Sequence, residues 1–311
     1  MIAFLFPGQG SQAVGMGKAF YDASPAAKAI FEDANDALGF DLARLAFEGP
    51  ESELALTANT QPAVLTVSVA AAAVAAERGL CPHLSAGHSL GEYSALVVAG
   101  ALAFRDAVRI VRRRGEFMQE AVPVGTGAMA AIMGLELPAV ERLCAAAAQG
   151  EVVEVANVNS PLQIVIAGHR PAVERAVALA SARGGRKSVM LPVSAPFHCA
   201  LMAPAAERLA RELDGVRIAD PTIPIARNVD GGLMRVAAEV KPALLRQVAS
   251  PVRWTDCVRR LADEGAMTFV EVGPGRVLTG LLKRILDGVK GMAVETSADL
   301  DKALAGAGER G

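Results

Sequence analysis

The chain has 311 residues, a formal net charge of −2 and 52% hydrophobic residues, which suits one large domain or a large domain carrying a smaller one. The small net charge argues against a protein built mainly to bind nucleic acid, which needs a basic excess. The four cysteines form no C-x-x-C pair, so we expect neither a disulfide framework nor a zinc site, and a cytoplasmic location fits.

The N-terminal part of the chain reads as alternating strands and helices. The apolar run Ile2–Phe6 has no basic segment before it, which predicts a first strand and not a signal peptide. A second strand is expected to end at Ala86, and helical patterns cover Ala26–Leu38, Pro62–Arg78 and Ala103–Val122. The Ala-rich helix falls short of a membrane span, so we expect it to be buried and expect no membrane partner. This alternation is typical of α/β proteins with a parallel sheet.

The middle of the chain follows a different order of elements. Strand, helix, two strands, helix and strand are expected in turn at Ala128–Met133, Pro138–Gln149, Val152–Asn157, Gln163–Ala167, Pro171–Arg183 and Lys187–Leu191. This β-α-β-β-α-β order is the ferredoxin-like plan. We therefore expect a small domain at residues 124–192, inserted into a large domain of residues 1–123 and 193–311.

The α/β pattern resumes in the last part of the chain. A strand is expected at Thr268–Val272 and a helix at Val277–Leu286, with a glycine-rich turn between them. The segment from Ala303 to the C-terminus is rich in Ala and Gly and is expected to be frayed.

The strongest local motif is Gly87-His88-Ser89-Leu90-Gly91, which matches G-x-S-x-G. In such a motif the glycines allow a sharp turn between a strand and a helix, and the serine hydroxyl is presented at the top of the turn. The backbone NH of Leu90, at the start of the new helix, can stabilise an oxyanion. Ser89 is therefore a candidate nucleophile, and a purely structural tight turn is the alternative.

A serine nucleophile needs a general base, and the chain has four histidines. His88 neighbours Ser89, so its side chain points away from the hydroxyl, while His169 and His83 fall in a turn and a loop. His198 lies where the chain re-enters the large domain and is the best candidate, with a hydrogen-bonded loop histidine as the alternative. No acidic residue between Ser89 and His198 falls at an obvious strand end, so a plain Ser-Asp-His triad is not supported.

Three consecutive arginines, Arg112 to Arg114, lie in the predicted helix Ala103–Val122. At about 100° per residue, Arg112 and Arg113 fall on the polar arc, and Arg114 is the only charged member of the apolar arc. A buried arginine needs an anion, because an unpaired buried charge is costly. A protein carboxylate is one candidate partner, and a substrate carboxylate gripped by the guanidinium fork is the other.

The loop after the first strand, Gly8-x-Gly10-x-x-Ala13, formally fits the dinucleotide-binding pattern. The acid expected about 20 residues later should end a second strand, but Glu32 and Asp33 fall inside a helical segment. A nicotinamide-dependent oxidoreductase is therefore a weak alternative. The loop can instead direct the backbone NH of Gln9 at an oxyanion.

Taken together, these motifs resemble the malonyl-CoA:acyl carrier protein transacylases, the acyltransferase family of fatty-acid and polyketide synthesis. The matching stretches are FPGQGSQ, TQPA, GHSLGEYSAL, RRGEFMQ, GTGAMAAI, NSP, APFHCALM, NVDG, SPVRWTD and EVGPGRVLTGL. They run in family order over essentially the whole chain. The resemblance implies an α/β-hydrolase-like large domain with a parallel sheet and a ferredoxin-like insert.

Roles follow from the resemblance by position. It implies that Ser89 is the acylated nucleophile, that His198 is its general base, and that the backbone NH groups of Gln9 and Leu90 form the oxyanion hole. It also implies that Arg114 clamps the malonyl carboxylate.

Two further residues take roles from the resemblance. The family orients its histidine through a main-chain carbonyl near a glutamine, and Gln247 occupies that place, which accounts for the missing acid. Phe197, just before the histidine, resembles the malonyl-selective pattern and is expected at the substrate. Arg253 stands where some relatives have glutamine, and we attach no function to it.

The implied reaction is ping-pong transfer of a malonyl group from malonyl-CoA to the phosphopantetheine thiol of holo acyl carrier protein. No metal or bound cofactor is implied, and we expect a monomer. A serine thioesterase or hydrolase on the same scaffold is the alternative, and a non-catalytic carrier-binding module is another. Because the carrier is acidic in this family, candidate basic contacts are Arg112, Arg113, Arg183, Arg186 and Lys187, with a merely solvated face as the alternative.

Overall fold

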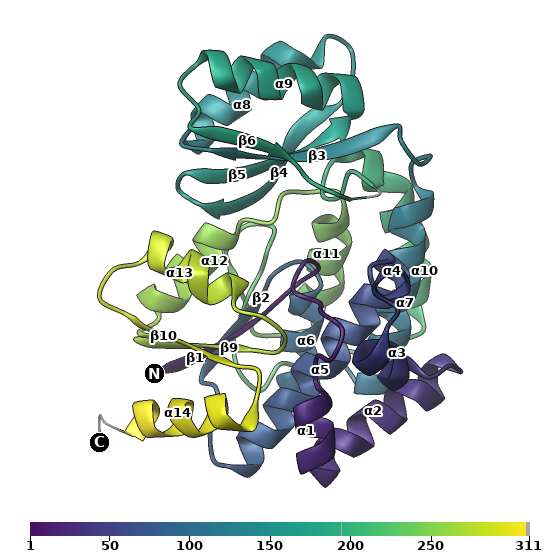
Figure 1. Cartoon of the computed structure of the whole chain (residues 1–311), viewed down its shortest axis with the longest axis vertical. Coiled ribbons are helices and arrows are strands. Elements are labelled where there is room, and N and C mark those ends of the chain that lie inside the picture. The colour runs from purple at the N-terminus through teal and green to yellow at the C-terminus, as the bar shows by residue number, and fades with distance from the viewer. Residues whose placement is uncertain (194, 309–311) are drawn as a thin grey trace.

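The computed structural model describes residues 1–193 and 195–308, which form two β-sheets with helices around them (Figure 1). The larger sheet has the strand order β10 (Lys290–Val294), β9 (Thr268–Val272), β1 (Ile2–Phe6), β2 (Leu84–Gly87), β7 (Ile225–Ala226) and β8 (Leu233–Met234). Its neighbouring strands are parallel except for the β7–β8 pair. The predicted α/β class with a mostly parallel sheet is confirmed.

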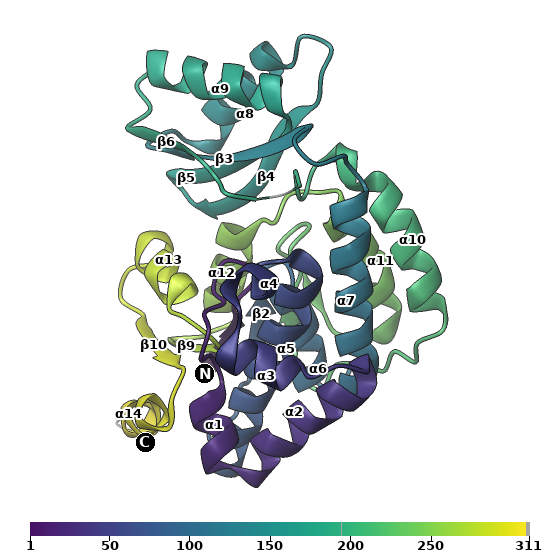
Figure 2. The same cartoon turned by 45° about the vertical axis from the view of Figure 1, so that its right-hand side comes forward.

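The smaller sheet is antiparallel throughout and has the order β4 (Val153–Ser160), β5 (Gln163–His169), β3 (Gly127–Met133) and β6 (Lys187–Met190). With α8 (Leu137–Ala148) and α9 (Arg170–Ala182), it has the predicted β-α-β-β-α-β element order. In Figures 1 and 2 both helices cover the face turned away from the larger sheet. Both faces of this sheet are buried. Along β3, Ala130 and Ile132 pack under these helices, while the alternate residues Met129 and Ala131 join the main core.

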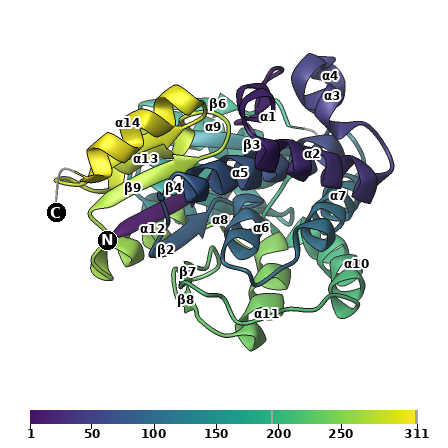
Figure 3. The same cartoon turned by 90° about the horizontal axis from the view of Figure 1, so that it is seen from below.

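The large sheet is covered on both faces by helices. One face carries α1 (Lys18–Ala23), α2 (Pro25–Leu38), α3 (Leu42–Glu48), α4 (Glu51–Leu54), α5 (Thr57–Glu77), α6 (Gly91–Val98), α7 (Phe104–Glu120), α10 (Ala203–Asp214), α11 (Ala237–Val248) and α14 (Ser297–Gly308), and the other carries α12 (Trp254–Asp263) and α13 (Val277–Ile285). The alternation along β1 fits this layering, because Phe4 and Phe6 enter the first core and Ala3 and Leu5 the second. Figure 3 shows α14 at the β9–β10 side of the sheet, away from β7 and β8.

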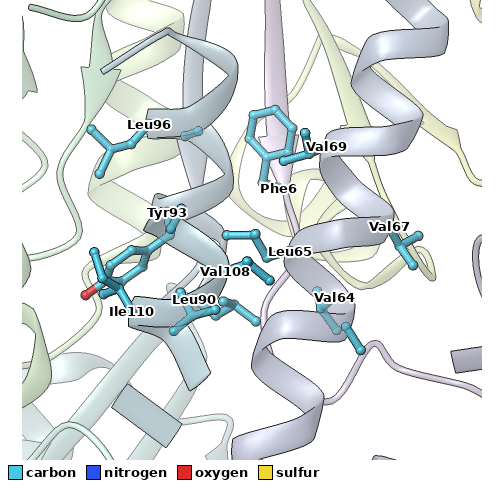
Figure 4. Packing of buried hydrophobic residues seen from close by; sticks show 14 of the residues in the cluster. Phe6, Val64, Leu65, Val67, Val69, Leu90, Tyr93, Leu96, Val108 and Ile110 are labelled. Atoms are coloured by element: carbon cyan, nitrogen blue, oxygen red, sulfur yellow. The ribbon is translucent and has the colours of Figure 1, made fainter. Parts of the chain in front are cut away.

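Helix α5 is the central helix of the fold. Within the described residues it alone is long and apolar enough to cross a membrane by length and composition, but 89% of its apolar window is buried in the protein, as the sequence predicts. Leu65 packs beside Val108 of α7, and Val69 packs beside Phe6 of β1 (Figure 4). The helix begins at Thr57 and not at the predicted Pro62. Because Pro62 has no NH, it leaves the carbonyl of Ala58 without its helical donor.

The two sheets are joined by main-chain pairing. The NH of Val158 donates to the Val252 carbonyl at 2.9 Å, and the Val252 NH donates to the Ala156 carbonyl at 2.9 Å. The contact runs parallel to β4, which is an edge strand of its own sheet. A segment of the large sheet's chain thus extends the smaller sheet by one short pairing.

The C-terminal segment departs from the prediction of fraying. Helix α14 runs from Ser297 to Gly308, and Leu300 and Ala303 are buried against the first core. Alanine favours helix and outweighs the glycines here once one face is packed. Residues 309–311 of that segment lie outside the described residues.

Candidate active site

Ser89 stands on a sharp turn between β2 and α6. Its φ of 52° lies in the left-handed region, which is strained for any residue other than glycine. A Cβ on Gly87 would lie 1.8 Å from the backbone of Gly91, and a Cβ on Gly91 would lie 2.1 Å from the Phe6 carbonyl oxygen. The two glycines are therefore required by close packing, and the turn fixes Ser89 at the carboxyl end of the parallel strands.

The structure brings Ser89 and His198 into contact. The Ser89 Oγ lies 2.7 Å from Nε2 of His198, and Nδ1 of His198 lies 2.8 Å from the carbonyl oxygen of Gln247. A carbonyl only accepts, so Nδ1 carries the hydrogen and Nε2 presents its lone pair to the serine hydroxyl. His198 is buried and its own φ of 61° is left-handed. The backbone of a glutamine thus does the orienting that an acid does in a triad.

The surroundings of His198 keep its imidazole neutral. Burial and, to a smaller extent, the positive charge of Arg114 together lower its pKa to about 3, although the hydrogen bond to the Gln247 carbonyl opposes them. A neutral imidazole is the form that can take a proton from the hydroxyl.

Arg114 reaches the same place from α7. Gly115 allows this, because a Cβ there would lie 2.7 Å from the Thr57 carbonyl oxygen and from Cα of Ala58, so α7 packs tightly against the start of α5. Arg114 as a whole is 2% exposed. Its Nη1 donates to Gln61 Oε1 at 2.8 Å, and its Nη2 donates to Gln247 Oε1 at 2.9 Å and to Ser89 Oγ at 3.2 Å.

The partners of Arg114 are neutral. Among the residues that the structure describes, it forms no salt bridge, and its Nε has no hydrogen-bond partner. Burial lowers its pKa, which shows the cost of the desolvated charge. Of the two partners considered from the sequence, a protein carboxylate in direct contact is therefore absent.

Gln247 connects the parts of the cluster. Its Nε2 donates to the Ser89 carbonyl oxygen at 2.8 Å and to Glu92 Oε2 at 2.6 Å, while its Oε1 accepts from Arg114. Asn228 supports the turn, because its Oδ1 accepts from the Ser89 NH and its Nδ2 donates to the Gly87 carbonyl, both at 2.7 Å.

Three members of this cluster, Gln61, Glu92 and Asn228, received no role from the sequence. The signal that points to them is their position inside the stretches TQPA, GHSLGEYSAL and NVDG, on which the family resemblance rests.

A cavity of about 440 Å³ opens between the two sheets in front of Ser89. Gln9, Leu90 and Phe197 line it from the large-sheet side, and Met129 and Asn157 line it from the small sheet. In the described part of the chain, the backbone NH groups of Gln9 and Leu90 have no acceptor in the loops or side chains around them. The cavity therefore brings together a serine hydroxyl, an imidazole, a guanidinium and two backbone NH groups.

Comparison with known proteins agrees with this arrangement. The family named Acyl transferase domain matches residues 3–304. The chain belongs to this acyl transferase family.

Relatives within the acyl transferase family match this chain over nearly their full length. The Malonyl CoA-acyl carrier protein transacylase of Salmonella typhimurium is 51% identical over 97% of this chain and 98% of its own, and the one of Bacillus subtilis is 48% identical over 97% and 96%. Among solved structures, an acyl carrier protein S-malonyltransferase of Vibrio cholerae has a TM-score of 0.95 at 50% identity, covering 97% of this chain and 99% of its own. A malonyl-transacylase in complex with its type II PKS acyl-carrier protein has a TM-score of 0.96 at 48% identity, covering 98% and 99%.

The other histidines of this acyltransferase are engaged elsewhere. Nε2 of His88 bonds Oδ1 of Asn159 at 2.9 Å, and its ring lies 5.4 Å from that of Trp254. His83 accepts a backbone NH at Nδ1, and so does His169. This agrees with the selection of His198 from the sequence.

The glycine loop of the acyltransferase packs against the serine turn. A Cβ on Gly8 would lie 2.5 Å from the His88 carbonyl oxygen. Glu32 and Asp33 lie within α2, and Asp33 pairs with Arg105 at 2.7 Å. Gly8 thus has a packing role and Gly10 a left-handed φ of 98°, and the dinucleotide-binding alternative loses its support.

Arg112 departs from its predicted position on the solvent face. It is half-buried, its Nη1 donates to Asn59 Oδ1 at 2.5 Å and to the Ala58 carbonyl at 3.5 Å, and its guanidinium lies over the ring of Phe40. The carbonyl is the one that Pro62 leaves without a helical donor, but the short bond to Asn59 and the ion pair with Glu116 at 3.4 Å are the closer contacts. A helical wheel does not reveal the contact with α5.

Proposed function

We propose that this acyltransferase moves a malonyl group from malonyl-CoA to the phosphopantetheine thiol of holo acyl carrier protein, through a malonyl ester on Ser89. The observation that carries the proposal is the position of Arg114, a buried cation that no carboxylate of the described residues contacts, 3.2 Å from the hydroxyl that bonds His198. The full-length relatives named malonyl CoA-acyl carrier protein transacylase support it.

In the first half-reaction, Ser89 Oγ attacks the thioester carbonyl carbon and its proton passes to Nε2 of His198. The carbonyl oxygen becomes an oxyanion, which the NH groups of Gln9 and Leu90 would receive. When the tetrahedral intermediate collapses, the carbon–sulfur bond breaks, and coenzyme A leaves as a thiol with the proton from His198. Gln247 accepts from Nδ1 throughout and stabilises the imidazolium.

The second half-reaction uses the same groups in reverse. The phosphopantetheine thiol gives its proton to His198 as the sulfur attacks the ester carbonyl. Collapse breaks the bond to Ser89 Oγ, which takes back the proton, and malonyl-carrier protein leaves. General base catalysis of this kind contributes about 10²–10⁴-fold.

Arg114 supplies the selectivity for a carboxylate-bearing acyl group. A malonyl carboxylate would replace Ser89 Oγ as the acceptor for Nη2, which frees the serine to attack. Phe197, which lines the cavity and is buried, would limit the bulk of the group beside the base.

The fold proposal is an α/β-hydrolase-like domain of residues 1–123 and 193–311 with a ferredoxin-like insert at 124–192. The strand order of the small sheet supports the second part, because counted within the insert it is 2-3-1-4, that of the ferredoxin-like plan. The cytoplasmic location and the monomer expected from the sequence belong to the same proposal.

The carrier protein would dock beside the small sheet. Arg186, Lys187 and Arg284 line one surface pocket, whereas Arg112 and Arg113 are engaged by neighbours in the protein. An acidic carrier would meet three cations there. Lys187→Glu should slow the carrier-dependent step and leave malonylation of Ser89 unchanged.

The test is to mix the protein with malonyl-CoA and follow release of coenzyme A with and without holo carrier protein, with intact mass spectrometry of both proteins. We expect a rapid stoichiometric release with malonyl on Ser89, followed by steady release only when carrier is present. Fast release that is indifferent to carrier would establish the hydrolase alternative, and an unmodified Ser89 would overturn covalent transfer.

A further inference from the structure

Glu92 is a buried carboxyl group next to the catalytic cluster. It lies on α6, three residues after Ser89, and has no exposed surface. Its Oε2 accepts from Gln247 Nε2 at 2.6 Å, while its Oε1 has no partner among the described residues. A buried carboxylate with half of its acceptors unused is costly unless a positive charge is near.

The nearby positive charge is that of Arg114, which lies on the other side of the Gln247 carboxamide. The carboxamide of Gln247 donates to Glu92 through Nε2 and accepts from Arg114 through Oε1. The cation and the carboxyl group therefore bind the two ends of the same neutral bridge. Neither has a salt-bridge partner of its own among the described residues.

Few other groups that can carry a charge face Glu92. Arg114 approaches from α7, and Asp230 from the loop after β7. Tyr93 on its own helix and Cys257 on α12 also lie near, but burial raises the pKa of both, so they stay neutral. Gln61, which α5 contributes to the cluster, is neutral. The balance of charge is thus between Arg114 and the carboxyl groups around it.

A substrate carboxylate on Arg114 changes this balance. With Glu92 ionised, the empty site holds one positive and one negative charge. A malonyl carboxylate adds a second negative charge to the same cation, in a region where water does not screen the repulsion. A proton on Glu92 removes that repulsion.

We propose that Glu92 is a positioning residue that serves as the counter-charge of Arg114 across Gln247 and takes up a proton from solvent when a malonyl carboxylate binds Arg114. This inference rests on the proposed function, which places the carboxylate at Arg114. The proton adds to one carboxylate oxygen, and Oε1 is available for it without breaking the bond to Gln247.

The acidity of Glu92 suits this exchange. Burial raises its pKa to about 7, against the opposing effects of its hydrogen bonds and of Arg114. Above pH 7 the empty site therefore holds Glu92 largely ionised, and binding must draw in a proton. Well below pH 7 the carboxyl group is already protonated and binding draws in none. By linkage, the affinity for malonyl-CoA then falls as pH rises above 7, by at most about tenfold per pH unit.

The experiment is calorimetry on Ser89→Ala, which binds malonyl-CoA without acylation, at pH 7.5 in buffers of different ionisation enthalpy. The slope of heat against buffer enthalpy gives the protons taken up. Coenzyme A, which carries the same phosphates without the malonyl group, is the reference ligand. Glu92→Gln in the same background keeps an acceptor for Gln247 and removes the titrating group.

We compare the number of protons taken up with malonyl-CoA and with coenzyme A. At pH 7.5 we expect malonyl-CoA to take up more by over about a quarter of a proton and by less than one. At pH 5.5, and in Glu92→Gln at either pH, we expect no difference. Equal slopes for the two ligands, or an uptake that persists in Glu92→Gln, would overturn the inference.

A second readout keeps the inference testable if a variant is unstable. The KM for malonyl-CoA of the unmodified enzyme should rise between pH 7 and pH 8.5 while the maximal rate of Ser89 malonylation changes less, and a flat KM refutes the role of Glu92. Intact mass on the same samples separates the two proposals. If Ser89 is not malonylated, the proposed function fails; if it is malonylated without proton linkage, only this inference fails.

Discussion

Arg113 and Arg114 are neighbours on α7, but their environments are opposite. Arg113 has 48% of its side chain exposed and pairs with Glu116 at 2.6 Å and Glu212 at 3.3 Å. Arg114 is almost fully buried and binds two glutamine oxygens and a serine hydroxyl. The exposed arginine is in contact with its anions, whereas the buried one has no anion in direct contact among the described residues.

The difference between the two environments explains how the protein keeps the buried Arg114 available to an incoming anion. A direct carboxylate partner would stabilise Arg114 but would compete with an incoming anion. Neutral amides offset part of the desolvation cost and leave the charge itself uncompensated in direct contact. We therefore expect changes around Arg114 to affect acyl transfer, and changes around Arg113 to affect little.

The largest expected effect is that of Arg114→Ala on malonyl transfer. Losing a charge that pairs across a buried contact costs about 2–5 kcal/mol, or roughly 30- to 5,000-fold in malonyl kcat/KM. Transfer of an acetyl group, which has no carboxylate, should be much less affected, and Arg113→Ala is the matched control. The measurement is kcat/KM for both acyl-CoA substrates. An equal loss for malonyl and acetyl would mean that Arg114 is structural and would erase the contrast between the two arginines.

The next effect is on stability, through the amide that bridges the cluster. Gln247→Ala leaves Arg114 and Glu92 without their shared partner, and a buried polar group without a partner costs about 1–3 kcal/mol. Urea denaturation should show a loss of this size in the free energy of unfolding. Gln163→Ala is the control, because Gln163 binds Arg284 at the surface and its loss should change little. Comparable losses for both would argue that burial of the cluster carries no special cost.

A smaller effect concerns pH. Because the pKa of His198 lies far below its ordinary value of 6.5, the imidazole stays in its neutral, basic form as pH falls. At pH 5.5 an ordinary histidine would be only about one-tenth neutral. Stopped-flow malonylation of Ser89 should therefore give a kcat/KM at pH 5.5 within about twofold of its value at pH 7. A tenfold fall would show that His198 titrates normally and that its burial by the Arg114 cluster is incomplete.

The smallest effect is expected from Arg113→Ala. Exposed ion pairs contribute about 0–1 kcal/mol, so the free energy of unfolding should change by less than about 1 kcal/mol. Added salt should reduce the difference further, because it screens exposed charges. A larger change that persists in high salt would mean that the packing of Arg113 over the Phe117 ring, and not its charge, matters.

Helical periodicity could identify Arg114 from the sequence, since seventeen consecutive residues form one helix with a clear apolar face. G-x-S-x-G likewise marks the turn at Ser89, because its glycines are required locally. Periodicity does not reveal that Gln61, Glu92, Asn228 and Gln247 meet in space, since they come from different elements far apart along the chain. Only the resemblance gave Gln247 a role, and nothing local predicted that Arg112 would bind Asn59 on α5.

The main-chain pairing between β4 and Val252 affects how the protein resists aggregation and how its cavity can change by mutation. The outer edge of β4 would otherwise offer unpaired NH and carbonyl groups to another molecule, which is a common route to aggregation. Here part of that edge is occupied by the chain itself. Backbone groups make the contact, so the pairing itself does not depend on the identity of the side chain at Val252, although that side chain is fully buried in the second core. New acyl preferences would then arise by changing the lining residues, with the two halves of the cavity held at a fixed spacing.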